Sequence, residues 1–417
     1  MKAVTFGEIM LRLKTPEYLR IVQAQNFEAS YGGAEANVAA GLAMLKEEAA
    51  LVTKLPDNPV GQAALNELRR YGTDTTHILR GGKRLGIYYF EKGNNIRPTN
   101  VVYDRADSAF ACSKPDEYDW DQILEDTDIF FFSGVTPAVS ESVKETVLDA
   151  LRCCKRKGIE VVCDLNYRAK MWDKNTAQCV MRELMPYVTL CIANDEDFEA
   201  SLGIHAFDGD MSRGIEQIDT YREGMQEITR QFPNCKAVAS VLRSMYTVED
   251  GDWMAIYLIG DQFYETPVHH VHSLEAVGAG DAFAAALIHM LKKKENPQYT
   301  IDFSIAASVL KLMIQHDFNI VTEEDIKAFA KGVTLDDGYE TMPAELIILK
   351  SDEISEIELT IHEGKFHQVK RMFESVDKKV IYLKRLSMGK LKLDENLELG
   401  EYRELTDEEV KMIEERD

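Results

Sequence analysis

Short apolar segments alternate with helical segments along most of the first 330 residues of the chain. Residues 127–135 (TDIFFFSGV) and 159–168 (IEVVCDLNYR) have the composition of buried strands, and residues 140–158 between them have the periodicity of an amphipathic helix that ends at Gly158. The segment AEANVAAGLAML at 34–45 also has helical spacing. Strands linked in this way form a mostly parallel sheet with helices on both faces. The sequence therefore predicts an α/β fold.

Polar residues directly follow several of the predicted strands. In an open α/β sheet, ligands bind beyond the carboxyl ends of the strands. The residues that fall at this edge are Ser133, Gly134, Asp164, Asn166, Arg168 and Asn194. We therefore expect a binding site there.

Length and charge limit the remaining possibilities. The 417 residues exceed the usual size of one hydrophobic core, so we expect two domains or one large domain with an appendage. With 48 basic and 71 acidic residues, the net charge of −23 argues against non-specific nucleic-acid binding by the whole molecule. The sequence has no apolar run of a membrane-spanning length and no signal-peptide pattern, which predicts a cytoplasmic protein without a membrane partner. The seven cysteines lack metal-ligand spacing and are expected to be reduced, buried thiols.

A glycine-rich turn precedes an alanine-rich helical segment at residues 275–291 (EAVGAGDAFAAALIHML). The N–H groups of Gly278, Ala279 and Gly280 can point into one concavity, where the positive end of the following helix would help to hold an anion. Asp281 would stand beside that anion as a general base, which suits phosphoryl transfer to a hydroxyl. A turn with Asp281 as a helix cap is the structural alternative. The chain has no GxxxxGK[ST] motif, so this is not a Walker-type site.

Two motifs in this order resemble the signatures of ribokinase-type (PfkB) carbohydrate kinases. YGGAEANVAAGLAML at 31–45 is similar to their N-terminal sugar-binding signature, and VGAGDAFAAALI at 277–288 is similar to the second signature. Further segments resemble the branch of 2-keto-3-deoxygluconate kinases: GEIMLRL at 7–13, YDRADSA at 103–109, SGVTPAVS at 133–140, DLNYRAKMW at 164–172, SVLRS at 240–244 and DFNIV at 317–321. The resemblance covers residues 1–330 and implies a kinase domain over 1–331, with a ribokinase-like three-layer α/β/α sandwich and a small β lid.

The resemblance also implies an activity. The expected reaction is ATP-dependent phosphorylation of 2-keto-3-deoxygluconate at its terminal hydroxyl to give 2-keto-3-deoxy-6-phosphogluconate, with ATP and Mg²⁺ as cofactors. Asp281 would be the base, and Gly278, Ala279 and Gly280 would form the anion hole. The implied substrate-binding residues are Gly33, Tyr88, Tyr103, Arg105, Arg168 and Asp317. The implied nucleotide-binding residues are Asn166, Asn194, Arg243, Ser244, Gly278 and Gly280. Another sugar or sugar acid of the same family is the alternative substrate.

The charged residues of these motifs bear on the substrate and on the metal. Two arginines near one pocket favour an anionic substrate, because a guanidinium fork matches a carboxylate. Glu275 stands where the family usually has aspartate, and Asp197 ends the segment NDED at 194–197, which replaces Asn-x-x-Glu. Both positions keep a carboxylate, so we assign the candidate magnesium site to Asp197 and Glu275. His316 replaces the glycine of a common GDFN motif, which reduces the backbone freedom of that turn.

Two strand-like segments, residues 11–30 and 84–105, lie outside the strand–helix alternation. They carry Tyr88, Tyr103 and Arg105, so we expect them to form the lid over the sugar site. A small sheet exposes apolar residues and strand edges unless it is paired. Lid-to-lid contact therefore predicts a homo-oligomer, either a dimer or larger.

The character of the chain changes after residue 331. Residues 333–417 resemble the C-terminal half of bacterial ribosomal-RNA pseudouridine synthases, which carry a catalytic aspartate in an Arg-Leu-Asp motif before this region. No Arg-Leu-Asp occurs in this chain, so we expect residues 332–417 to be a partial domain without that aspartate. Alternation predicts strands at 356–364 and 378–386, and helical spacing predicts a helix at 366–376, which together suggest a small α+β unit.

The charge of this C-terminal region is uneven. Nine basic and two acidic residues lie between Lys365 and Lys392, a pattern compatible with RNA contact. Residues 333–417 as a whole carry 13 basic and 22 acidic residues, and half of the synthase domain is missing. We therefore do not expect RNA binding. An RNA-associated module for which the kinase fold serves as a carrier or regulatory partner is the alternative.

Overall fold

The computed structural model describes residues 2–331, 345–350, 356–361, 364–365, 367–374, 380–388, 391–394, 397, 402–406 and 409–410. The chain divides into two units. The first comprises Met1–Lys331 and Pro343–Thr360, and the second comprises Gly332–Met342 and Ile361–Asp417. The antiparallel strand pair β15 (Glu345–Lys350) and β16 (Glu356–Thr360) thus groups with the first unit, whereas we expected one boundary near residue 332. No helix within these described ranges is long and apolar enough to cross a membrane.

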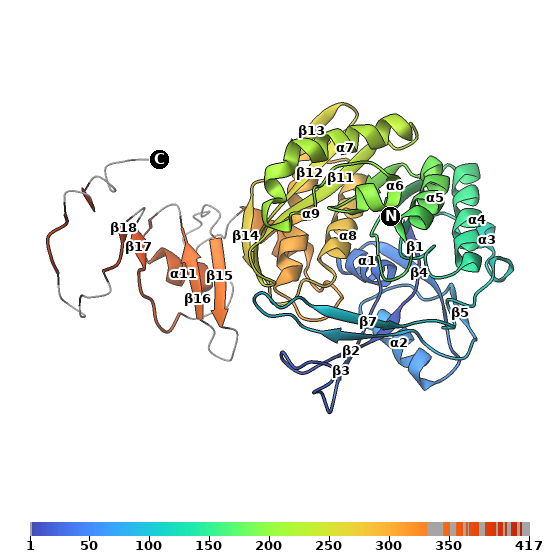
Figure 1. Cartoon of the computed structure of the whole chain (residues 1–417), viewed down its shortest axis with the longest axis horizontal. Helices are drawn as coiled ribbons and strands as arrows, with labels where there is room; N and C mark the ends of the chain where they lie inside the picture. Colours follow the sequence, from blue (N-terminus) through green and yellow to red (C-terminus); the bar gives the residue numbers. More distant parts are fainter. Residues whose placement is uncertain are drawn as a thin grey trace. The chain divides into compact units, whose positions relative to one another are not determined.

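A ten-stranded sheet forms the middle of the first unit (Figure 1). Its strand order is β13-β12-β11-β10-β9-β8-β1-β4-β5, with β14 paired to β12. The strands from β11 to β5 in this order are parallel, and β12, β13 and β14 pair antiparallel. The bounds are β1 Lys2–Phe6, β4 Glu48–Leu55, β5 Ile78–Arg80, β8 Ile129–Ser133, β9 Glu160–Asp164, β10 Leu190–Ile192, β11 Ala237–Met245, β12 Asp250–Ile259, β13 Gln262–Glu265 and β14 His269–His272. The predicted mostly parallel sheet is confirmed.

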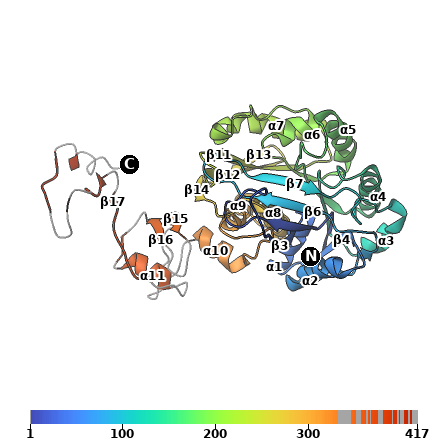
Figure 2. The ribbon, with the colours of Figure 1, turned by 60° about the horizontal axis from the view of Figure 1, so that its bottom comes forward.

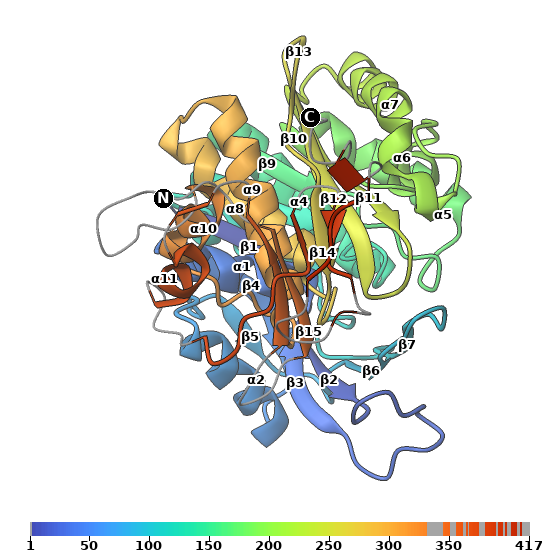
Figure 3. The ribbon, with the colours of Figure 1, turned by 90° about the vertical axis from the view of Figure 1, so that its left-hand side faces the viewer.

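Helices cover both faces of this sheet, as Figures 2 and 3 show. Alternate residues of a strand point to opposite faces, and in β8 Phe130 and Phe132 pack in the core that includes α4–α7, whereas Ile129 and Phe131 pack in the core of α1, α8 and α9. Both faces are buried, which explains why the strand segment is apolar throughout. The bounds are α1 Ala34–Met44, α2 Pro59–Arg70, α3 Trp120–Ile123, α4 Glu141–Lys157, α5 Lys174–Leu184, α6 Asp197–Leu202, α7 Ile218–Gln231, α8 Ala279–Lys293, α9 Pro297–Leu312 and α10 Glu323–Lys331.

A separate four-stranded sheet is formed mostly by the two segments that stood outside the strand–helix alternation, and it extends to Met10 and Gly32 (Figure 2). Its order is β3-β2-β6-β7, with bounds β2 Met10–Lys14, β3 Glu28–Gly32, β6 Ile87–Glu91 and β7 Asn100–Asp104. Tyr88 on β6 is directly opposite Tyr103 on β7, and their ring centroids are 6.4 Å apart. Opposite residues of paired strands share a face, so this sheet presents the two tyrosines together.

The cysteine prediction holds only in part. All seven cysteines are free, but Cys112 and Cys179 are exposed. Cys179 lies on α5 midway between Ala177 and Met181, which are both buried. A helical residue two positions from its buried neighbours points away from the core, and the apolar composition around Cys179 did not reveal this orientation.

The second unit contains α11 (Gln368–Glu374) and a strand pair, β17 (Ser387–Met388) with β18 (Leu391–Lys392). Helix α11 confirms the helix predicted at 366–376. The strand predicted at 378–386 is wrong for residues 380–386, which form neither strand nor helix. Tyr382 is 76% exposed there, together with the apolar residues Ile381 and Leu383. Apolar–polar alternation produces a strand only where a neighbouring strand and a core accept it, and this segment meets neither condition among the described residues.

Helices α1 and α8, which carry residues of the expected active site, depend on a small residue where they pack. A Cβ added to Gly41 in α1 would lie 2.9 Å from the Cβ of Ala285 in α8. We expect Gly41→Val to lower the free energy of unfolding by about 1–3 kcal/mol, because the larger side chain forces the helices apart. Chemical denaturation measures this loss. Glu223→Val, at an exposed position of α7, is the matched control and should cost less than half as much; equal losses would contradict the packing argument.

Candidate active site

A cavity of about 690 Å³ lies beyond the carboxyl ends of the parallel strands. It is lined by most of the residues that the sequence motifs placed in the site: Gly33, Tyr88, Tyr103, Arg105, Asn166, Arg168, Asn194, Asp197, Arg243, Gly278, Ala279, Gly280, Asp281 and Asp317. These residues are far apart in the sequence and meet because the strand ends and the small sheet converge there. Glu275 and Ser244 do not line the cavity.

The turn before α8 has unpaired backbone donors. Gly278 precedes the helix with a φ of 80°, a conformation that favours glycine, and a Cβ on it would lie 2.3 Å from the carbonyl oxygen of Asp317. Within the described ranges, the N–H groups of Gly278, Gly280 and Asp281 donate to no other residue. Free N–H groups at the positive end of a helix are suited to bind an anion.

Asp281 lies in the first turn of α8 and is half-buried at the cavity. Burial raises the pKa of its carboxyl to about 7, although the amide of Asn37 opposes the shift by donating to Oδ2 at 2.6 Å. The nearby carboxylates of Asp317 and Glu35 raise the pKa further. A carboxyl with a pKa close to neutral accepts a proton efficiently, as a general base must.

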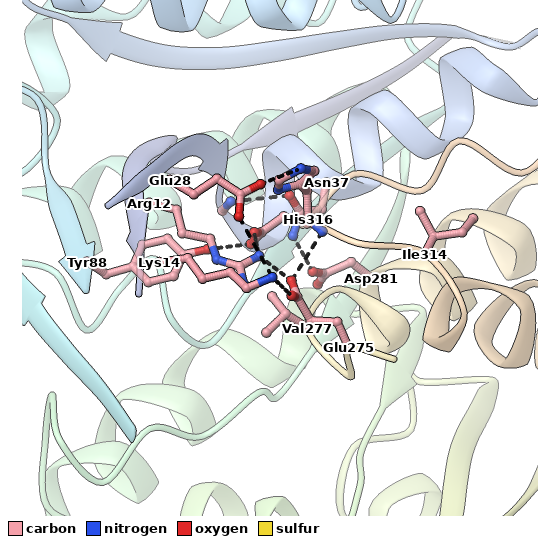
Figure 4. A network of polar contacts seen from close by, with 12 residues as sticks. Arg12, Lys14, Glu28, Asn37, Tyr88, Glu275, Val277, Asp281, Ile314 and His316 are labelled. Carbon is pink, nitrogen blue, oxygen red and sulfur yellow. Dashed lines mark hydrogen bonds and ion pairs between the residues drawn. The ribbon is translucent and has the colours of Figure 1, made fainter. Parts of the chain in front are cut away.

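The side of the cavity next to the small sheet holds a buried polar network (Figure 4). Tyr88 donates to Oδ2 of Asp317 at 2.6 Å, and Arg12 on β2 donates to Oδ1 of Asp317 at 2.9 Å. Arg12 also pairs with Glu275 at 2.5 Å, and Lys14 pairs with Glu275 at 2.8 Å. The network links the small sheet to the turn before α8 and to the segment after α9.

Arg105 is held in place at the cavity by Glu8. Its Nε and Nη2 atoms contact the Glu8 carboxylate at 2.8 and 2.6 Å. Among the described residues, its Nη1 donates only to the sulfur of Met171 at 3.4 Å, which is a weak acceptor. One edge of the guanidinium therefore stays available to a ligand in the cavity.

Gly33 lines the cavity, and the backbone packed against it leaves no room for a side chain. It precedes α1, and a Cβ on it would lie 2.0 Å from the carbonyl oxygen of Glu8. Its N–H donates to Oδ1 of Asn37 at 3.3 Å. A side chain at Gly33 would therefore push the start of α1, which carries Asn37, away from the backbone of Glu8.

The opposite side of the cavity has two different arginines. Arg168 follows β9, is exposed, and forms no ion pair with any described residue. Arg243 on β11 is paired with Asp195. Arg243 lines the cavity, but Ser244 is buried and its hydroxyl accepts the N–H of Ile215 at 3.1 Å. Consecutive strand residues point to opposite faces, which argues against a nucleotide contact by the Ser244 side chain.

Two further carboxylates line the cavity near Asp281. Asp197 accepts the N–H groups of Tyr167 and Asn194 at 2.7 and 3.1 Å, and burial raises its pKa to about 6. Burial and the neighbouring Asp197 raise the pKa of Asp164 well above its usual value. Oδ1 of Asp164 is buried and has no hydrogen-bond partner in the described part of the chain. No cluster of three or more metal-binding side chains occurs in that part either.

Glu275 differs from these carboxylates because two cations neutralise it. Its pKa is lowered to about 2: burial opposes the shift, but Arg12 and Lys14 outweigh it. A carboxylate that is already paired twice and lies outside the cavity lining is poorly suited to bind a metal ion. This placement argues against the assignment of magnesium to Glu275.

Sequence reasoning missed three residues of the site. Arg12, Lys14 and Asn37 contact Glu275, Asp317 or Asp281. Arg12 lies within GEIMLRL and Asn37 within the first signature, so both were in segments already singled out. An arginine and a lysine two residues apart on a predicted strand share a face, which was the available signal for Arg12 and Lys14.

Two RNA-modifying enzymes are similar to a short part of this chain. An uncharacterized RNA pseudouridine synthase of Bacillus subtilis is 49% identical over 96 residues, which are 23% of this chain and 40% of that protein. The ribosomal small subunit pseudouridine synthase A of Vibrio vulnificus is 52% identical over 85 residues and is covered to 36% of its length. The chain thus spans less than half of either synthase, and the fusion expected from the sequence is confirmed.

Carbohydrate kinases are similar to the larger part of the chain. The 2-dehydro-3-deoxygalactonokinase of Haloferax volcanii is 36% identical over 329 residues, which are 79% of this chain and 96% of the relative. The solved structure of 2-dehydro-3-deoxygluconokinase from Thermotoga maritima is 43% identical with a TM-score of 0.75, over 79% of this chain and 99% of that chain. A model of the pfkB family of carbohydrate kinases matches residues 1–313. The chain belongs to the pfkB family of carbohydrate kinases.

Proposed function

We propose that the protein transfers the γ-phosphoryl group of ATP to the terminal hydroxyl of 2-keto-3-deoxygluconate, giving 2-keto-3-deoxy-6-phosphogluconate. One observation carries this proposal. Asp281, with a pKa raised to about 7, stands beside the unpaired N–H groups that begin α8, in the same cavity as Arg105 and Arg168. A base next to an anion hole is what phosphoryl transfer to a hydroxyl requires.

Each step of the proposed reaction has a residue in the cavity. Asp281 takes the proton from the substrate hydroxyl, whose oxygen then forms a bond to the γ-phosphorus while the bond to the ADP oxygen breaks. Asn37 holds the Asp281 carboxylate through Oδ2, so that Oδ1 faces the hydroxyl. The N–H groups of Gly278 and Gly280 donate to the phosphoryl oxygens as charge develops on them. Arg168, which is exposed, lines the cavity and forms no ion pair with a described residue, neutralises phosphate charge.

Asp164 and Asp197, which line the cavity, are better suited to hold Mg²⁺ than Glu275, which does not line it. The orphaned Oδ1 of Asp164 and the neighbouring Asp197 would hold the ion through its water shell, because Mg²⁺ keeps most of its waters. When bound with ATP, Mg²⁺ neutralises phosphate charge and orients the transferred group.

A sugar acid is the proposed substrate because of the unshared edge of Arg105. The similar kinases of Haloferax volcanii and Thermotoga maritima are named for 2-dehydro-3-deoxy sugar acids that differ as galacto and gluco forms. We propose that Arg105 binds the carboxylate, with Tyr88, Tyr103 and Asp317 holding the hydroxyls. Coupled release of ADP with a panel of gluco and galacto acids, neutral sugars and other sugar acids tests the substrate class. Release only with neutral sugars would contradict it.

Asp281→Asn should lower kcat roughly 100-fold or more, because the amide keeps the shape and loses the proton acceptor. The melting temperature should stay the same or rise, since folding no longer desolvates a carboxylate. For the unchanged protein, kcat/KM should fall as the pH drops below about 7, where the carboxyl becomes protonated. Asp302→Asn on α9, outside the cavity lining, is the control. Near-full turnover by Asp281→Asn refutes the role of the base.

Arg105→Lys keeps the charge and loses the planar fork. A charge-assisted hydrogen bond contributes about 1.5–3 kcal/mol, so KM for the sugar acid should rise roughly 10- to 100-fold. Steady-state kinetics with sugar acid and with ATP as the varied substrate separate this effect, because KM for ATP should not change. Arg84→Lys, which affects the ion pair with Asp104 outside the cavity lining, is the matched control. An unchanged KM for the acid would leave Arg105 without a part in recognition.

We propose that residues 332–417 do not isomerise uridine, since the Arg-Leu-Asp motif is absent. Incubation of the full-length protein with ribosomal RNA should yield no pseudouridine by mass spectrometry. Removal of these residues should leave phosphorylation of the sugar acid largely intact, because the similar kinase of Thermotoga maritima is covered to 99% by 79% of this chain. Pseudouridine formation, or a shortened chain that folds and is inactive, would favour the RNA-associated alternative.

A further inference from the structure

A buried lysine lies behind the turn that forms the proposed anion hole. Lys311 is the penultimate residue of α9 and is fully buried. Its ammonium donates to the backbone carbonyls of Val277, at 2.9 Å, and Ile314, at 3.1 Å. Buried lysines are uncommon because a desolvated charge is costly unless it is paired or hydrogen-bonded.

The two carbonyls belong to different segments, and Figure 4 labels both residues, with Val277 beside Glu275 and Ile314 apart from it. Val277 precedes Gly278, the residue before α8, and Ile314 lies two residues beyond the end of α9. The segments also meet through Leu312, whose carbonyl accepts the N–H of Leu274 at 2.8 Å. The hydrogen bond from Lys311 to Val277 therefore joins the two segments one residue before Gly278, at the turn that starts α8.

The Val277 carbonyl sets the direction of the next N–H. In a trans peptide the C=O and N–H groups point in opposite directions. With the Val277 oxygen held towards Lys311, the N–H of Gly278 points away from the lysine, and Gly278 lines the cavity. Lys311 thus orients the N–H of Gly278 without itself contacting the phosphoryl group that this N–H would bind.

The charge of Lys311 is retained at neutral pH. Burial lowers the pKa of Lys311 to about 8, and Arg12 adds to this effect, while Asp317, Glu275 and Asp281 oppose it. A singly charged group held between two carbonyl oxygens has the same electrostatic role as a bound monovalent cation.

Resting on the proposed phosphoryl transfer, we propose that Lys311 is a positioning residue whose ammonium serves as a built-in monovalent cation that aligns the Gly278 N–H for the transferring phosphoryl group. The unchanged protein then needs no dissolved monovalent cation. Removal of the side chain beyond Cβ leaves a space bounded by the Val277 and Ile314 carbonyls, which a small cation such as K⁺ or NH₄⁺ fits.

The test compares Lys311→Ala and Lys311→Met with the unchanged protein in KCl, NH₄Cl and tetramethylammonium chloride at equal ionic strength. Lys311→Ala should lose roughly 100-fold in kcat in tetramethylammonium, because a misdirected donor acts on the chemical step. K⁺ or NH₄⁺ should raise kcat of Lys311→Ala at least about tenfold over its value in tetramethylammonium, since both ions can bind carbonyl oxygens. KM for the sugar acid should change little. Lys311→Met fills the space without charge and should not respond to either cation.

Thermal stability provides a readout that does not depend on activity. The melting temperature of Lys311→Ala should rise in K⁺ or NH₄⁺ relative to tetramethylammonium, because an ion that binds only the folded state stabilises it. Val309→Ala, a buried truncation on the same helix, should lose stability without any cation response. The unchanged protein should show the same kcat and melting temperature in all three salts.

Two results would overturn the inference: near-full kcat for folded Lys311→Ala in tetramethylammonium, or equal, cation-independent losses for the Ala and Met variants. A cation requirement in the unchanged protein would do so as well. Failure of the proposed function looks different, because the unchanged protein would then be inactive on every sugar acid while the melting temperature of Lys311→Ala still responded to the cation.

Discussion

The close approach of Gly278 to the backbone of Asp317 is the contact on which the geometry of the site depends. Only glycine suits this position, because its φ is 80° and a Cβ would lie 2.3 Å from the Asp317 carbonyl oxygen. The contact brings the start of α8 against the segment that follows α9. Asp281 and Asp317, which are 36 positions apart in the sequence, line one cavity as a result. At the same turn, the N–H groups of Gly278, Gly280 and Asp281 have no partner among the described residues, so they can donate to an incoming phosphate.

The carboxylates around this contact have different partners. Glu275 is paired with Arg12 and Lys14, and its pKa is lowered to about 2. Asp281 accepts a hydrogen bond from the neutral amide of Asn37, and its pKa is raised to about 7. Opposite charge favours the ionised form of a buried acid, whereas burial alone favours the neutral form. The first carboxylate is therefore suited to hold two segments together, and the second is suited to exchange a proton.

Periodicity and end signals predicted most of the fold because they are local properties of the chain. The helix predicted at 140–158 appears as α4, with Ser140 accepting the N–H of Val143 at its start and Gly158 at a φ of 69° at its end. The strand predicted at 127–135 appears as β8. The wrong predictions concern segments whose structure depends on packing against another part of the chain. Residues 380–386 alternate like a strand but form none, and residues 381–386 are exposed. Cys179 has apolar residues nearby in the sequence but is exposed on the outer face of α5.

The sequence by itself determined the parallel sheet, the glycine turn with Asp281 after it, and the fusion, because spacing and residue type carry that information directly. Only the tertiary structure decided what each charged residue faces. Ser244 is buried next to Arg243 and accepts the N–H of Ile215. Glu275 pairs with Arg12 and Lys14 of β2, and Lys311 donates to two backbone carbonyls. The pKa and the role of a charged group depend on groups brought near it by folding, and such neighbours come from positions that no local pattern connects.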